Sequence, residues 1–344
     1  MLPTFPLAVN HCVDCTHVQL TECVSREEIF EEYIYVSGTT ETLRQDFKNF
    51  AIEITERHGV GRILDIACND GSQLDAFKEL GWETWGIDPA KNLFETSSAN
   101  HNVLCDFLND SHLELGKFDV VIAQNVLAHT NDPLNFLKIA GQMTSNLYIQ
   151  TSQADMIFKG QFDTIYHEHL SFFSQASMNE LALRGGMHIS SVSRRKIHGN
   201  SYLFHLVNQK TNFVPSELVT QEVLSTFRKV AENIIHDLRL MLNELKNQKV
   251  TIVGYGAAAK GMTVLNAVGI TIDFVIDDNP LKQNTFTPGL AIPVRSIASL
   301  NDVGDSICLL PLAWNFADEI LERVAQKYNG EIKLLKYFPE VILC

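Results

Sequence analysis

The sequence predicts an α/β protein with two doubly wound, Rossmann-like domains in tandem. Apolar strand-like runs alternate with helix-like segments through residues 62–212 and again after Lys249. Each half also opens with a strand, a glycine-containing loop and a helix, at Ile63 and at Val250. Such alternation is typical of parallel sheets covered by helices. Because 344 residues exceed one ordinary core, two domains plus a smaller unit are expected.

The first half contains five apolar runs of strand type, separated by segments with helical spacing. They are RILDIA, WETWGID, VLCDF, FDVVIAQ and NLYIQTS. A helix-like segment, QASMNELALRGG, is expected to end at Gly185 and Gly186, because glycine is favoured just after a helix. HISSVSRR and SYLFHLV are predicted as two further strands.

A long amphipathic helix is expected over residues 216–247, as a connector between the two halves. The runs KVTIVGYG, TIDFVIDDNP and SICLLPL follow as strands, and another helix is expected to begin near Asn315. The predicted division has four parts, namely residues 1–45 as a small N-terminal module, 46–212 as the first doubly wound domain, 213–247 as the connecting helix and 248–344 as the C-terminal Rossmann-like domain.

Composition restricts the classes of function. The formal charge of −14 argues against nucleic-acid binding, which depends on Lys and Arg clusters. The sequence contains no run of about 18 apolar residues, so no membrane-spanning helix is expected. The N-terminus lacks the features of a signal peptide. Seven cysteines, an odd number with irregular spacing, indicate reduced thiols in a cytoplasmic protein rather than a disulfide framework. A small-molecule substrate is therefore expected, with neither nucleic acid nor membrane as a partner.

The first glycine loop carries acidic residues where a Rossmann site contacts its ligand. Small residues and carboxylates follow the first strand, and other carboxylates end or follow the next two strands. The loop lacks the G-x-G-x-x-G pattern of dinucleotide-binding proteins. Its acidic residue would also repel the negatively charged pyrophosphate of NAD(P). S-adenosylmethionine, which carries a sulfonium, an amino group and no phosphate, suits this loop better than NAD(P); an acidic turn without a ligand is the alternative. The predicted cofactor residues are Asp65, Ala67, Asn69, Asp70, Gly71, Asp88, Asp106 and, after the fourth strand, Asn125.

The run Tyr166-His167-Glu168-His169 follows the fifth strand and is expected at the same crevice, as is His129 after the fourth. Three interpretations stay open for the run: a metal site, a structural role and proton transfer. A metal usually needs a third ligand, and none lies nearby in sequence. An imidazole titrates near neutral pH, a carboxylate can tune it, and a phenol can hydrogen-bond an oxyanion. These groups suit proton abstraction next to a carbonyl, followed by methylation of the resulting carbanion.

Several motifs resemble one known family in the same order along the chain. They include FEEYIYVSGTT, DIACNDGSQL, FDTIYHEHLSFFS, RKIHGNSYLF, VGYGAAAKGMTVLN and FVIDDNPLKQNTFTPGLAIPV. The chain resembles the SAM-dependent nucleotide-sugar C-methyltransferases, which have a zinc-binding N-terminal module, a central SAM domain and a C-terminal Rossmann-like domain. The resemblance implies methylation at C-3 of a dTDP-linked 4-keto-deoxysugar, with His169 as general base and Glu168, Tyr166, His129 and Tyr33 or Tyr35 beside it.

Two motifs depart from the family pattern. The family's zinc module has two Cys pairs, whereas only Cys12 and Cys15 form one here, so residues 1–45 are expected to be a remnant whose zinc binding is doubtful. The family's His-Gly-Gly-Ser, taken as a sugar contact, appears as His198, Gly199, Asn200 and Ser201. Asn adopts the left-handed backbone that glycine favours, which makes the second departure mild.

The second glycine loop is predicted to hold the diphosphate of the substrate. Gly254 and Gly256 lie before a helix N-terminus, and Lys260 supplies a positive charge. A Rossmann-like domain used only for packing is the alternative. For the whole chain, the rivals to C-methylation are O- or N-methylation, a non-catalytic SAM- or nucleotide-binding protein and, less favoured, an NAD(P)-dependent oxidoreductase.

Overall fold

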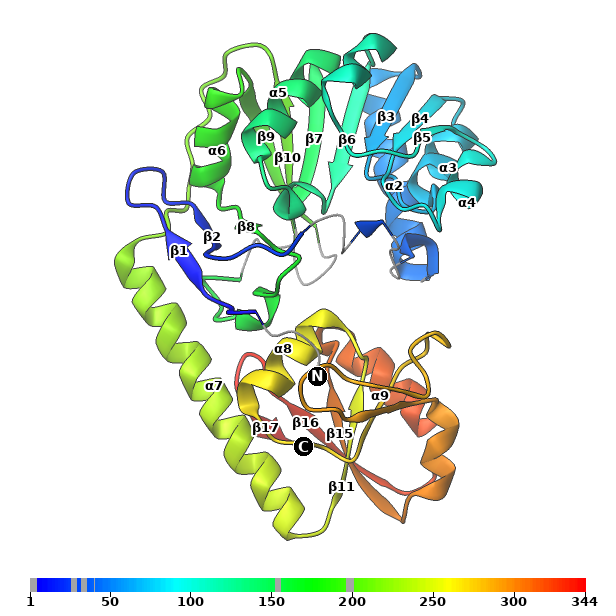
Figure 1. Cartoon of the computed structure of the whole chain (residues 1–344), viewed down its shortest axis with the longest axis vertical. Coiled ribbons are helices and arrows are strands. Elements are labelled where there is room, and N and C mark those ends of the chain that lie inside the picture. The colour runs from blue at the N-terminus through cyan, green and yellow to red at the C-terminus, as the bar shows by residue number, and fades with distance from the viewer. Residues whose placement is uncertain (1–4, 26–29, 32–35, 40, 152–155, 196–200) are drawn as a thin grey trace. The chain divides into compact units, whose positions relative to one another are not determined.

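The computed structural model describes residues 5–25, 30–31, 36–39, 41–151, 156–195 and 201–344. The chain forms two compact units (Figure 1). The N-terminal unit consists of Pro6–Ala154 and His167–Val219. The C-terminal unit consists of Met1–Phe5, Asp155–Tyr166 and Thr220–Cys344, so a short segment from the middle of the sequence belongs to it. None of the helices in the described ranges is long and apolar enough to cross a membrane.

The N-terminal unit is built on a seven-stranded sheet of order β5-β4-β3-β6-β7-β10-β9. The first five strands in this order are parallel, and β10 runs antiparallel to both β7 and β9. The strand order reverses between β3 and β6, which is where α/β sheets of this kind bind ligands. The strands are β3 (Arg62–Ile66), β4 (Glu83–Ile87), β5 (Asn102–Leu104), β6 (Val120–Gln124), β7 (Asn146–Thr151), β9 (His188–Arg195) and β10 (Ser201–Val207). The predicted doubly wound sheet is confirmed.

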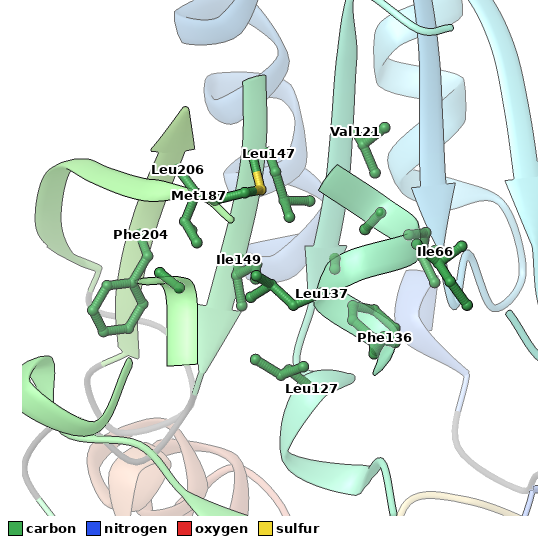
Figure 2. Close-up of a cluster of buried hydrophobic side chains, with 14 of the residues drawn as sticks. Ile66, Val121, Leu127, Phe136, Leu137, Leu147, Ile149, Met187, Phe204 and Leu206 are labelled. Atoms are coloured by element: carbon green, nitrogen blue, oxygen red, sulfur yellow. The ribbon is translucent and has the colours of Figure 1, made fainter. Parts of the chain in front are cut away.

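Helices cover both faces of this sheet because its strands are apolar on both sides. Val121 and Ile149 pack in one core with Phe136 and Leu137 (Figure 2). Ile122 and its neighbours pack in a second core on the opposite face. The first core includes α5 (Pro133–Met143) and α6 (Gln175–Arg184), and the second includes α2 (Glu41–His58) and α3 (Ser72–Glu79). Shorter elements are α4 (Phe94–Ser98) and the 3-10 turns η1 (Ser37–Thr39), η2 (Asp110–Leu115) and η3 (Leu127–His129).

A small three-stranded sheet joins the N-terminal residues to the segment after the YHEH run. Its order is β1-β2-β8, with β1 (Val9–His11), β2 (Val18–Leu20) and β8 (Ser171–Phe172). Leu20 N donates to Leu170 O at 2.9 Å, and Val18 pairs with Phe172. The strands β1 and β2 therefore pack as part of the N-terminal unit.

The C-terminal unit contains a second seven-stranded sheet, of order β13-β14-β12-β11-β15-β16-β17. The five inner strands are parallel, and β13 and β17 are antiparallel edges. The strand order reverses between β11 and β15. The strands are β11 (Thr251–Tyr255), β12 (Phe274–Ile276), β13 (Thr285–Phe286), β14 (Pro293–Arg295), β15 (Ser306–Pro311), β16 (Glu331–Lys336) and β17 (Ile342–Leu343).

The long helix α7 (Gln221–Asn247) packs into the core of the C-terminal unit through Leu238 and Leu242. It begins five residues later than predicted, because the side chain of Thr220 accepts a hydrogen bond from Val223 N and caps the helix there. The unit also contains α8 (Ala259–Val268), α9 (Ala317–Ala325), η4 (Phe162–Thr164), η5 (Ile297–Asp302) and η6 (Trp314–Phe316). The four-part division of the chain remains a prediction beside these two units.

Candidate active site

The loop after β3 turns sharply at the carboxyl end of the sheet. Ala67, Asn69 and Gly71 all have positive φ, of 65°, 51° and 84°. A Cβ on Gly71 would lie 3.3 Å from Ser97 Cα, so glycine is required there for both conformation and space. Asp70 lies on the same turn, where its Oδ1 accepts from Ser72 N at 3.1 Å. The predicted loop residues thus form one tight turn between β3 and α3.

Two buried carboxyl groups, Asp65 and Asp88, lie at this loop. Burial raises the pKa of Asp65 well above its ordinary value, and the charges of Asp88 and Asp70 raise it further. The pKa of Asp88 is also raised, first by burial, although hydrogen bonds from Ala90 N and Asn69 N oppose the increase. A cation beside these carboxylates would offset both effects. The loop is therefore electrostatically suited to a positively charged ligand.

Asn69 and Asp70 also hold another part of the chain over the loop. Asn69 Oδ1 accepts from Ser37 N, and Asp70 Oδ2 accepts from Gly38 N, both at 2.9 Å. A Cβ on Gly38 would meet Asp70 Oδ2 at 2.7 Å. The two side chains fix η1, just after the segment that contains Tyr33 and Tyr35. Both tyrosines lie outside the described residues.

Asp106 follows β5 and is exposed. Its Oδ2 accepts from Asn109 Nδ2 at 2.8 Å, and its Oδ1 accepts from Phe107 N. It lies in the turn before η2, where an adenine-binding role stays a prediction.

His129 and His169 come together although 40 positions separate them in the chain numbering. Their ring centroids are 5.0 Å apart, with the planes at 72°. Leu170 N donates to Ala128 O at 2.7 Å, which joins the two segments by their main chains. The ring of Phe30 lies against His129 at 5.5 Å. Burial lowers the pKa of His129 to about 4, although hydrogen bonding to the main chain at Glu168 and Asn125 acts in the opposite direction and raises it. The imidazole of His129 is therefore neutral at pH 7.

The boundary between the two compact units falls within the YHEH run. Tyr166 is the last residue of the C-terminal unit's inserted segment, whereas His167, Glu168 and His169 belong to the N-terminal unit. His169 is 3% exposed, and His167 Nε2 lies 3.3 Å from Pro6 O. The run has no strand or helix of its own; η4 precedes it and β8 follows it.

Asn125 and Ser201 lie at the end of the same sheet. Asn125 has φ 55°, and its N donates to Gln150 O at 2.9 Å. Ser201 is fully buried at the start of β10. Its predicted partners in sugar binding, His198, Gly199 and Asn200, lie outside the described residues.

Sequence reasoning overlooked three polar residues at the carboxyl ends of β6 and β7. Gln124 Nε2, Gln150 Oε1 and Thr151 Oγ1 are buried without a hydrogen-bond partner in the described part of the chain, as are Asn125 Oδ1 and His129 Nδ1. Gln124 and Gln150 are paired across the two strands. Buried polar groups in native proteins are nearly always satisfied, so these atoms indicate ligand or water contacts. The signal in the sequence was the one used for Asp65: a polar residue ending a buried strand.

The second glycine loop, after β11, is held by its own unit. Gly256 has φ 96°, and Ala257 N donates to Asp277 Oδ2 at 2.7 Å. Lys260 lies in the first turn of α8 with its ammonium 5.9 Å from the centre of the Trp314 ring. A Cβ on Gly254 would meet Ile272 Cδ1 at 2.8 Å, so this glycine is needed for packing. Diphosphate binding by this loop stays a prediction.

Cys12 and Cys15 lie in the turn between β1 and β2. Main-chain hydrogen bonds at Cys15 and Asp14 lower the pKa of Cys12, whereas burial raises that of Cys15. No group of three metal-ligating side chains is present within the described ranges. A zinc ion therefore has no complete ligand set in that part of the chain.

Two family models match the chain in succession. A "Methyltransferase domain" matches residues 36–191, and a "C-methyltransferase C-terminal domain" matches residues 204–339. Among curated proteins, "C-methyltransferase NovU" from Streptomyces niveus is 27% identical, with 98% of this chain and 87% of the relative covered. "Ubiquinone biosynthesis O-methyltransferase" from Azorhizobium caulinodans is 32% identical over only 24% of this chain and 36% of its own.

Solved structures resemble about half of the chain. Magnesium protoporphyrin IX methyltransferase from Synechocystis PCC 6803 with bound SAH is 14% identical, with 48% of this chain and 83% of that chain covered and a TM-score of 0.39. The N-terminal domain of EvdMO1 with SAH bound is 16% identical, with 48% and 82% covered and a TM-score of 0.36.

The sheet order, the acidic loop after β3 and the methyltransferase model define a class I S-adenosylmethionine-dependent methyltransferase. The second model and the relative that spans nearly the whole chain narrow this class. The chain belongs to the SAM-dependent C-methyltransferase family.

The residues of the β3 loop fit S-adenosylmethionine. Burial raises the pKa of both Asp65 and Asp88, and the charge of Asp70 raises both further. A nearby cation offsets such shifts, and the cofactor carries an ammonium and a sulfonium. Asp88, at the end of β4, occupies the position from which a carboxylate hydrogen-bonds ribose hydroxyls in sheets of this type.

Proposed function

We propose that the chain methylates C-3 of a nucleotide-linked 4-keto-deoxysugar, probed as a dTDP sugar, with His169 as the general base. The contact between His129 and His169 carries this proposal. It brings a buried imidazole from the YHEH run to the residues that follow β6, at the ligand-binding edge of the sheet. The family resemblance supplies the substrate class.

His169 is proposed to accept the proton from the carbon next to the ketone. The electrons of the broken C–H bond move onto the carbonyl oxygen, which gives an enolate. Tyr166 is the proposed hydrogen-bond donor to this oxygen, and Glu168 is proposed to orient or tune the imidazole. His129, neutral at pH 7, adds no positive charge beside a base that must itself accept a proton. Bound S-adenosylmethionine supplies the electrophilic methyl group that the enolate carbon takes.

The buried polar atoms of Gln124, Gln150 and Thr151 are proposed as hydrogen-bonding contacts to the substrate, with Gln124 Nε2 as a donor, Gln150 Oε1 as an acceptor and Thr151 Oγ1 as either. A ketosugar offers a carbonyl acceptor and hydroxyl groups, which match amide and hydroxyl side chains. They support a polar small-molecule substrate over an apolar one.

The proposal is tested by incubating the protein with S-adenosylmethionine and a panel of dTDP-4-keto-deoxysugars. We expect a mass gain of one methyl group and, by NMR, a methyl carbon bonded to carbon. A methyl carbon bonded to oxygen or nitrogen would identify an O- or N-methyltransferase instead. No mass gain across the panel would overturn the sugar assignment.

A further inference from the structure

The strand order of the C-terminal sheet reverses between β11 and β15, which is where a crevice is expected in a sheet of this kind. Open α/β sheets bind nucleotides at such a point, between the loops that follow the two strands. Here those loops are the glycine loop around Gly256 and the turn η6, which begins at Trp314. The contacts of these loops show what this crevice holds.

A segment of the same unit, residues 156–166, supplies those contacts. Trp314 Nε1 donates to Asp163 Oδ2 at 2.7 Å, and Asp163 is completely buried. Thr263 Oγ1, on α8, donates to Ile165 O at 3.4 Å. The ring of Phe162 lies 5.8 Å from that of Phe338, after β16. The segment is thus held by the residues that follow β11, β15 and β16.

The charge of Asp163 is matched by Lys260. Burial raises the pKa of Asp163 and lowers that of Lys260, and in each case the charge of the other group opposes the shift. A buried charge is costly unless it is paired and hydrogen-bonded, so Asp163 and Lys260 stabilise each other. The charge of a carboxylate from the same chain thus already favours the charged form of Lys260.

The carboxylate at the end of β12, where a Rossmann site contacts ribose, is also used internally. Asp277 Oδ2 accepts from Ala257 N at 2.7 Å, and Oδ1 accepts from Asn279 N at 2.9 Å. Lys282 Nζ lies 3.5 Å from Asp277 and donates to Ala257 O at 3.0 Å. The carboxylate that would contact a ribose in a nucleotide-binding sheet is therefore hydrogen-bonded to the glycine loop instead.

We propose that this crevice is a socket for the chain's own residue Asp163, and that Asp163 and Trp314 are positioning residues for the YHEH run. Asp163 lies three residues before Tyr166, where the C-terminal unit's segment ends and the run passes into the N-terminal unit. Fixing Asp163 restricts where the run starts, and the main-chain bond from Leu170 to Ala128 restricts where it ends. The link to catalysis rests on the proposed function of His169; the socket itself does not.

Hydrogen–deuterium exchange tests the socket without any substrate. Trp314→Phe keeps an aromatic ring and removes the donor to Asp163. We expect the amides of Thr164 and Ile165, which donate to Gln161 O and Phe162 O, to exchange about five- to tenfold faster than in the wild type. Tyr328→Phe is the matched control, because it removes a tyrosine hydrogen bond to Gly304 O elsewhere in the unit. Unchanged exchange in Trp314→Phe, or an equal rise in the control, would overturn the socket.

Kinetics and nucleotide binding separate positioning from substrate binding. Trp314→Phe and Asp163→Asn should lower kcat about tenfold with KM for the nucleotide sugar unchanged, because substrate contacts stay in place. Added dTDP should leave the exchange of residues 161–166 unchanged. A rise in KM at constant kcat, or faster exchange at 161–166 with dTDP, would show a nucleotide site instead. If the wild-type protein methylates no 4-keto sugar, the proposed function fails, and the exchange data alone decide the socket.

Discussion

The imidazole rings of His129 and His169 meet at 5.0 Å, edge to face, in the N-terminal unit. His129 is held neutral by burial, which lowers its pKa to about 4. A neutral neighbour adds no positive charge beside His169, whereas a charged imidazole at this distance would oppose its protonation.

Replacing His169 by Gln should lower kcat by about 10²–10⁴-fold, the usual contribution of a general base. Exchange of the substrate's C-3 proton with solvent should fall in parallel, while calorimetric binding of S-adenosylmethionine stays unchanged. His167→Gln is the matched control, since this neighbouring side chain lies against Pro6 O. Undiminished proton exchange in His169→Gln would assign the base to another residue.

His129 should make stability depend on pH. Its folded pKa of about 4 lies below the ordinary value of 6.5, so its contribution is complete above pH 6.5 and is lost as the pH falls toward 4. At pH 5 the loss amounts to about 2 kcal/mol in the free energy of unfolding. Urea denaturation at pH 7 and pH 5 measures this loss in the free energy of unfolding. The variant His129→Gln should not show the contribution of about 2 kcal/mol. Identical pH dependence in wild type and variant would contradict the burial of an uncharged ring.

Asp65→Asn should weaken S-adenosylmethionine about tenfold, because it removes a buried negative charge that favours a cation. The wild-type affinity should also fall with decreasing pH, since a raised pKa lets Asp65 gain a proton earlier than an exposed carboxylate. Titration calorimetry across pH measures both effects, with Asp75→Asn on α3 as the control. An affinity equally independent of pH in wild type and Asp65→Asn would refute this role.

Gly86 should tolerate alanine only when Cys68 is also changed. A Cβ at Gly86 would lie 2.5 Å from Cys68 Sγ, which forces the β3 loop away from β4. Gly86→Ala should therefore reduce both thermal stability and affinity for S-adenosylmethionine, and adding Cys68→Ala should restore a large part of each. Cys68→Ala alone controls for the lost sulfur. Additive losses in the double variant would show that the two side chains do not clash.

The sheets and the acidic loop were predictable because they depend on short-range patterns. The apolar run before Asp65 and the small residues after it identify a strand and a turn without any knowledge of the rest of the chain. The sequence placed His129 and His169 at the same edge of the sheet, because both follow strands that end there. It could not predict that their rings are in contact, because strand order does not set the distance between them.

Long-range partners explain what the sequence did not reveal. The hydrogen bond between Asp163 and Trp314 joins residues 151 positions apart, and no local pattern encodes such a pair. The helix expected from residue 216 starts instead at Gln221, because the capping side chain of Thr220 outweighs an apolar spacing that continues upstream. Gln124 and Gln150 were overlooked because an amide in a buried strand carries no charge to mark it.

The pairing of β2 with β8 has a consequence for synthesis of the chain. His17 and Ser171, which lie 3.2 Å apart in this sheet, are separated by 154 positions, so β2 leaves the ribosome long before its partner exists. At about 5–20 residues per second, this delay is on the order of ten seconds or more. β2 therefore stays without this partner strand until β8 has been made, and the three-stranded sheet next to His169 is completed only then.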